Sequence, residues 1–129
     1  MNVIYIVSCL SPSGPTQQLY NIVSRLDPEI FNPTIITLSN SNKNIKKPQF
    51  TSLGIRVVEL NLSLVKLILF GRKKINLHIS FNIPDVIHTS GLRPDLLTSF
   101  CKINVPWILT VRNYPFDDYP SKFGKKGWF

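Results

Sequence analysis

The first 26 residues constrain the fold most strongly, because they have the pattern of a strand, a turn and a helix. Residues 2–8 are almost wholly apolar and rich in β-branched side chains, which is typical of a strand covered on both faces. Residues 9–15 contain two prolines, a glycine and two serines, and helical spacing of apolar residues then begins, at Leu19, Ile22, Val23 and Leu26. The pattern predicts a central parallel strand followed by an amphipathic helix.

The turn between this strand and this helix is a candidate binding loop. Gly14 lets a ligand approach the backbone closely, Pro15 suits a first helical turn, and the N–H groups from Thr16 onwards are expected to point beyond the strand, where an anion could bind. The turn has neither the GxGxxG pattern of dinucleotide-binding folds nor the Gly-Lys-Ser/Thr of a Walker loop. A tight turn without a ligand therefore remains an open alternative.

The alternation of strand and helix continues along the chain. Further β-branched runs at residues 34–38, 55–60, 86–89 and 106–111 predict strands, with helices near residues 49–53, across 63–81 and after Gly91, where Pro94 suits the first turn. The stretch 63–81 also fits a strand, but we interpret it as a helix with a kink or break at Gly71, because parallel strands need a crossover. The order predicts an α/β, doubly wound, Rossmann-like parallel sheet of about five strands, with helices on both faces and strand order 3-2-1-4-5.

Composition limits the classes of partner. The 129 residues suit one domain with a modest core, and 15 Lys and Arg against 7 Asp and Glu give a net charge of +8, which favours anionic partners. The lysines at 39–48 are interpreted as a solvated loop and not as a nucleic-acid patch, because only Phe50 accompanies them. The two cysteines lack CxxC spacing, so we expect no disulfide framework and no metal site.

The location of the protein is inferred from what the sequence lacks. It shows neither a signal peptide nor a run of apolar residues long enough to span a membrane, so we expect a cytoplasmic protein. No acidic residue occurs between Glu59 and Asp85, and the basic residues 72–74 directly follow apolar residues. We interpret this stretch as a core-packing helix with a solvated basic turn. Peripheral contact with the inner face of the membrane, through residues 64–74 and 122–129, stays open as the alternative.

The expected strand order brings distant residues together. Ligands of doubly wound sheets bind at the carboxyl ends of the strands, where the strand order reverses between strands one and four. The turn at Gly14 would there meet His88 and Thr89, which end strand four, and Arg112 and Asn113, which follow strand five. An imidazole, a guanidinium and a helix N-terminus form an anion-binding rim. Taken singly, His88 could be a core histidine and Arg112 part of a surface ion pair.

Several motifs resemble one family. Residues 2–8, 13–16, 21–26 and 31–38 are similar to the N-terminal domain of retaining glycosyltransferases of the GT-B fold, subfamily 4. Residues 84–91 resemble the strand-four motif of that family, and residues 106–113 resemble its next strand, so the resemblance covers essentially the whole chain. Family members continue into further strands and a second Rossmann-like domain, which holds most of the nucleotide-sugar site and a pair of glutamates. The resemblance therefore implies that residues 1–129 are a truncated N-terminal domain, incomplete at its C-terminus.

The resemblance also implies roles for residues. Gly14, Pro15 and Thr16 would lie near the donor diphosphate, and His88, Thr89, Arg112 and Asn113 would line the cleft that takes the acceptor. Arg112 stands where many members have a histidine, and no catalytic residue is assigned.

The implied function is the acceptor-side part of a sugar transferase of polysaccharide biosynthesis. It would need no cofactor, because the nucleotide-sugar is a co-substrate. Its partners would be a glycan or lipid-linked acceptor and a second GT-B domain in cis or in trans. The chain alone should be inactive. The alternative is a non-catalytic module that binds phosphate or nucleotide, or a partner subunit of a split transferase.

Overall fold

The computed structural model describes residues 1–39 and 41–110. Within them the elements follow in the order β1 (Asn2–Val7), α1 (Gly14–Val23), β2 (Asn32–Thr37), the 3-10 turn η1 (Ser41–Lys43), α2 (Lys47–Thr51), β3 (Arg56–Glu59), α3 (Leu64–Asn82), β4 (Val86–Ser90), α4 (Leu92–Ser99) and β5 (Trp107–Thr110). The alternation of strand and helix predicted from the sequence is confirmed.

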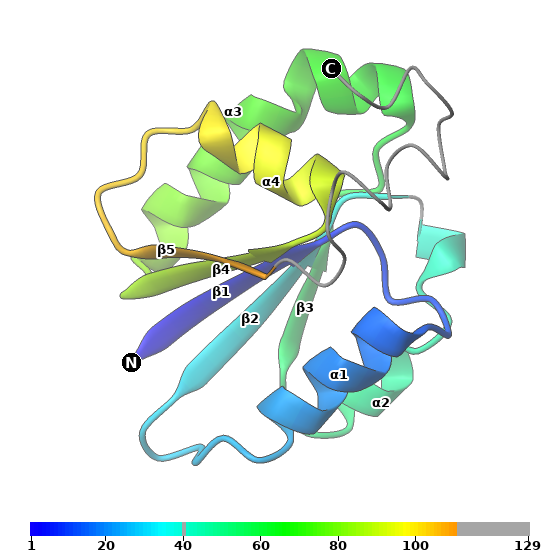
Figure 1. Cartoon of the computed structure of the whole chain (residues 1–129), viewed down its shortest axis with the longest axis vertical. Coiled ribbons are helices and arrows are strands. Elements are labelled where there is room, and N and C mark those ends of the chain that lie inside the picture. The colour runs from blue at the N-terminus through cyan, green and yellow to red at the C-terminus, as the bar shows by residue number, and fades with distance from the viewer. Residues whose placement is uncertain (40, 111–129) are drawn as a thin grey trace.

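The strands form one parallel sheet in the order β3-β2-β1-β4-β5, as the doubly wound pattern predicts (Figure 1). β1 is the central strand and pairs with β2 on one side and with β4 on the other. The register places Val7, at the end of β1, beside Ser90, at the end of β4. The two strands therefore end together at the carboxyl edge of the sheet, where the strand order reverses.

Helices cover both faces of the sheet, with α1 and α2 on one face and α3 and α4 on the other (Figure 1). Side chains of β1 alternate between the two cores because successive residues of a strand point to opposite faces. Ile4 and Ile6 pack in the core with Leu67 and Ile75 of α3, whereas Val3 and Tyr5 pack in the other core, with Leu19 of α1. A strand that serves two cores must be apolar on both faces, which explains the β-branched run at the start of the chain.

Two helix ends differ from the expectation. α1 begins at Gly14, before the predicted Thr16, because Ser13 caps the helix: its Oγ accepts a bond from the Thr16 N–H at 3.4 Å. The sequence pattern predicts that the helix after the fourth strand extends to Cys101, but α4 ends at Ser99 and Cys101 follows it.

α3 is an unbroken helix, which confirms the choice of helix over strand for this stretch and corrects the predicted break at Gly71. Gly71 is buried, and a Cβ atom on it would lie 3.2 Å from Leu97 Cδ2 of α4 and 3.3 Å from Leu67 Cδ1. The glycine therefore allows close packing of α3 against α4. None of the helices in the described residues is long and apolar enough to cross a membrane.

Candidate ligand-binding cleft

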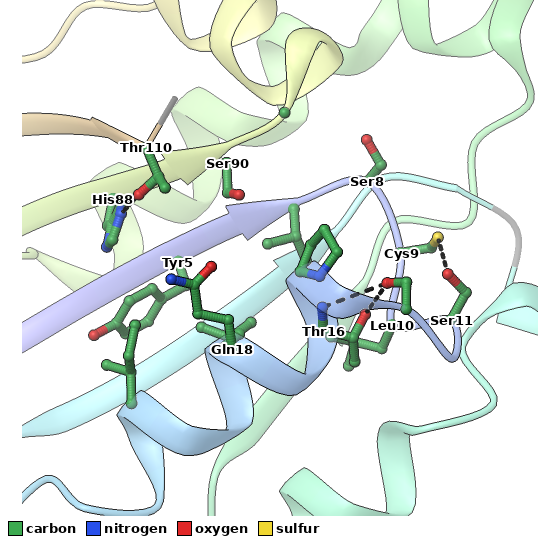
Figure 2. A pocket seen from close by; sticks show the side chains of 16 residues that line it. Tyr5, Ser8, Cys9, Leu10, Ser11, Thr16, Gln18, His88, Ser90 and Thr110 are labelled. Atoms are coloured by element: carbon green, nitrogen blue, oxygen red, sulfur yellow. Dashed lines mark hydrogen bonds between the residues drawn. The ribbon is translucent and has the colours of Figure 1, made fainter. Parts of the chain in front are cut away.

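A cavity of about 270 Å³ lies at the carboxyl edge of the sheet, beside the β1–β4 pair and the first turns of α1 (Figure 2). Doubly wound sheets bind ligands at this point, where the strand order reverses. The lining comes from β1, the loop after it, α1 and the ends of β4 and β5: Tyr5, Val7, Ser8, Cys9, Leu10, Ser11, Ser13, Pro15, Thr16, Gln18, Leu19, Ile22, His88, Ser90, Gly91 and Thr110.

Two aromatic rings form the sheet side of the cavity. Tyr5 and His88 are register partners on β1 and β4, and their ring centroids lie 5.3 Å apart at an interplanar angle of 44°. His88 Nε2 is hydrogen-bonded to Thr110 Oγ1 of β5. A tyrosine hydroxyl is protonated at neutral pH and can both donate and accept a hydrogen bond, and burial raises the pKa of Tyr5 further above its ordinary value.

The loop after β1 is held in place by a buried amide. Asn44 Oδ1 accepts a bond from the Leu10 N–H at 2.8 Å, and its Nδ2 donates to Thr37 Oγ1 and to Glu59 Oε2, each at 3.1 Å. Glu59 also forms a salt bridge with Lys47, and this contact is the main reason that the pKa of Glu59 is lowered. Residues from three segments thus fix the wall of the cavity. Sequence reasoning missed Asn44, because it lies in the polar stretch interpreted as a solvated loop.

The N-terminus of α1 has few N–H groups left for an anion. Pro15 has no N–H, the Thr16 N–H bonds to Ser13 Oγ, and the Gln17 N–H bonds to the Ser13 carbonyl at 3.0 Å. The hydroxyls of Ser13 and Thr16 are also bonded to each other, at 3.1 Å. The first turn of α1 therefore presents mainly neutral hydroxyl groups to the cavity.

The residues predicted for the site separate into three groups. Pro15, Thr16 and His88 line the cavity, and Gly14 stands at the start of α1 outside the lining. Thr89 is fully buried beside the other core, where its Oγ1 donates to Asp95 Oδ1 at 2.6 Å and accepts from Trp107 Nε1 at 2.9 Å. Arg112 and Asn113 lie outside the described residues, so their roles stay predictions, as do the roles assigned to the other site residues.

The lining mixes apolar side chains with hydroxyl groups. Six of the 16 lining residues are serine or threonine, and none of the 16 is Asp, Glu, Lys or Arg. Figure 2 shows Gln18 reaching from α1 towards Tyr5 and His88. No three His, Cys, Asp or Glu side chains are grouped to hold a metal ion within residues 1–39 and 41–110.

Sequence reasoning missed Tyr5, Ser8, Gln18, Ser90 and Thr110. Two signals could have found some of them: Tyr5 carries a hydroxyl within an apolar run, and Ser8 and Ser90 directly follow or end the two strands that meet there. A ligand with many neutral hydroxyl groups fits these hydrogen-bonding partners, and aromatic rings suit its apolar faces.

Comparisons with known proteins agree with this architecture. No family model matches the chain. Two Escherichia coli proteins, both named O-antigen biosynthesis glycosyltransferase WclY, are each 27% identical over 132 residues, which cover 96% of this chain and 32% of the relative. The crystal structure of a glycosyltransferase from Rickettsia africae ESF-5 superposes with a TM-score of 0.63 and 22% identity, over 97% of this chain and 35% of that one. Along almost its whole length, the chain is similar to about a third of a bacterial glycosyltransferase.

Proposed function

We propose that this chain is the acceptor-side part of a glycosyltransferase that moves a sugar from a nucleotide-sugar donor to a glycan or lipid-linked acceptor in polysaccharide biosynthesis. The relatives named for O-antigen biosynthesis support the reaction class, since they match 96% of the chain. The observation that carries the acceptor side is the cavity at the end of β1 and β4, which is lined by six serine and threonine residues and by no Asp, Glu, Lys or Arg among the described residues. Sugar hydroxyls pair well with serine, threonine and glutamine, whereas a diphosphate is best bound by cations and free N–H groups.

The rest of the catalytic machinery belongs to a second domain in this proposal. The chain spans about a third of the length of the curated relatives, and the family it resembles holds its nucleotide-sugar site mainly in a second GT-B domain. We propose such a domain in cis or in trans, and retaining transfer of a hexose, on the resemblance. Gly14 keeps its proposed place near the donor phosphate.

The proposed location is the cytoplasm, with peripheral contact with the inner face of the membrane. Both cysteines, Cys9 and Cys101, are free, which suits a reducing compartment. The membrane contact is supported by the exposed apolar and basic face of α3.

NMR titration of the 129-residue chain tests the cavity assignment. Methyl α-D-glucopyranoside, an uncharged sugar, should shift amide signals of residues 8–16 and 88–91, with an affinity in the range of about 1 mM, or roughly −4 kcal/mol. Gln18→Leu should weaken this binding because it removes a polar partner from the cavity wall. Gln17→Leu is the matched control, since Gln17 is the exposed neighbour on α1 and does not line the cavity.

Two results would contradict the proposal. If inorganic diphosphate shifted these amides and the sugar did not, the cavity would be a phosphate site, as in the alternative of a phosphate- or nucleotide-binding module. Calorimetry with UDP-glucose should show weak binding and no transfer by the chain alone. An affinity near 1 μM, about −8 kcal/mol, would mean that the chain holds the donor site itself.

A further inference from the structure

The outer face of α3 is unusual for a helix that packs on a sheet. Its buried residues are Leu67, Gly71 and Ile75, which follow one another at steps of four residues. Leu64 and Ile68 are exposed, with Ile68 73% accessible. Large apolar side chains therefore extend along the solvent side of the helix, at Val65, Ile68, Leu69, Phe70, Leu77 and Phe81.

Positive charges lie among these apolar side chains. At spacings of three and four residues, one exposed stripe of α3 carries in turn Lys66, Phe70, Lys73, Lys74, Leu77 and Phe81. α3 contains no Asp or Glu, and none of its lysines or its arginine forms a salt bridge within the described part of the chain. Burial is the main reason that the pKa of His78 is lowered, and the charges of Arg56 and Lys74 lower it further. The effect of these two charges reflects the positive potential at this helix.

This mixture fits a lipid surface better than a protein partner. Lysine is depleted in the cores of protein–protein interfaces, where its desolvation is unfavourable. At a bilayer surface, the lysine stem lies along the apolar region and its ammonium group reaches the head groups, so lysine and phenylalanine can share one stripe. Figure 1 shows that α3 is the outer layer on its side of the sheet, with α4 beside it.

We propose that the exposed stripe of α3 binds the surface of an anionic phospholipid bilayer, with Phe70, Leu77 and Phe81 entering the interface and Lys66, Lys73 and Lys74 contacting the head groups. The stripe lies on the face of the sheet opposite α1, which lines the cavity. Lipid binding and sugar binding are therefore separable. The inference adds residues and a lipid class to the membrane contact within the proposed function, and it can fail or succeed independently of sugar transfer.

Co-sedimentation of the 129-residue chain with vesicles tests the proposal. The chain should bind vesicles of equimolar phosphatidylglycerol and phosphatidylcholine, and bind poorly to phosphatidylcholine alone. Binding should weaken as salt rises, because the screening length falls from about 10 Å at 0.1 M to about 3 Å at 1 M. Lys73→Gln with Lys74→Gln should reduce the affinity by about 25-fold, which is about fivefold for each lysine near an anionic surface.

Matched variants separate the stripe from general charge and hydrophobicity. Arg25→Gln with Lys43→Gln removes the same two charges from exposed positions outside α3 and should leave most binding intact. Phe70→Ser with Phe81→Ser should weaken binding at every salt concentration, whereas Ile30→Ser with Ile45→Ser, at exposed positions elsewhere, should not. Circular dichroism checks that each variant is folded.

Three outcomes would overturn the proposal. The first is no binding of the parent chain to the anionic vesicles. The second is equal binding to anionic and neutral vesicles that the lysine variant leaves unchanged. The third is a dimer of the parent chain in sedimentation velocity that Phe70→Ser with Phe81→Ser abolishes, while vesicle binding stays intact. This result would assign the face to a second copy of the chain.

Discussion

Asn44→Ala should be among the most destabilising single changes outside the apolar core, because Asn44 joins three segments of the chain. The change removes the acceptor of the Leu10 N–H, and Leu10 is fully buried, so this N–H would be left without a partner at a cost of about 1–3 kcal/mol. It also removes the bond to the buried Thr37 hydroxyl, which contributes about 1 kcal/mol. The bond to Glu59 is partly replaceable, since Lys47 remains.

We therefore expect a loss of about 3 kcal/mol in the free energy of unfolding, which for a domain of this size lowers Tm by about 10 °C. Differential scanning calorimetry measures the loss, with Asn42→Ala as a control at an exposed position in the same loop. A Tm within about 2 °C of the parent would refute the reasoning, because a shift that small corresponds to less than about 1 kcal/mol.

Asn44→Asp adds a pH signature to the same test. A carboxylate at position 44 can still accept from Leu10 but cannot donate to Thr37, and it lies next to the carboxylate of Glu59. Burial and the like charge raise its pKa in the folded state above the ordinary value of about 3.9. The destabilisation should be complete above this raised pKa and shrink, relative to the parent, as the pH falls towards 3.9 and the carboxyl protonates. A pH-independent difference would contradict the contact with Glu59.

Three further predictions concern contacts on the two faces of the sheet. Lys47→Gln should remove stability above about pH 5 and have little effect near pH 3 in urea titrations, because Lys47 lowers the pKa of Glu59 from 4.5 and such a contribution is lost as the carboxylate protonates. Gly71→Val should destabilise the chain by about 1–3 kcal/mol in the same assay by overpacking α3 against α4, so an unchanged midpoint would argue against their close approach. Thr89→Val should lower the free energy of unfolding by about 1–3 kcal/mol, because it leaves Trp107 Nε1 and Asp95 without their shared partner. The NMR shifts induced by sugar should stay unchanged, and their loss would mean that Thr89 contributes to the cavity.

The fold was predictable because local patterns are enough to define it. A β-branched run that is apolar on both faces needs helices on both sides, and short strands alternating with helical segments leave few topologies for a parallel sheet. Once Ile4 and Val3 are assigned to opposite faces of β1, the two cores follow. Gly71 was misread for a local reason: glycine weakens an isolated helix, but here its missing side chain leaves the space that Leu97 of α4 occupies, so the helix continues through it.

The cavity was less predictable, because its walls come from residues that are distant in sequence and polar in a context that suggests solvent. The strand order correctly indicated the edge where His88 meets the turn after β1. It could not indicate that Ser13 would use its hydroxyl to cap α1, or that Thr89 would face away from His88 into the other core. Such assignments depend on the alternation of single side chains, which a shift of one residue in a strand boundary reverses.

The structure also separates two explanations of the net charge. A charge of +8 on the whole chain favours anionic partners, and from the sequence alone a phosphate-bearing donor is as good a partner as a lipid surface. The described lining of the cavity has no lysine or arginine, while α3 alone carries Lys66, Arg72, Lys73 and Lys74 without an acidic residue. Electrostatic attraction acts over about 10 Å at 0.1 M ionic strength, so charges on the outer face of α3 act mainly on what approaches that face. Among the described residues, the outer side of α3 therefore carries basic side chains that the lining of the cavity lacks, so an anionic partner is expected at α3 sooner than at the cavity.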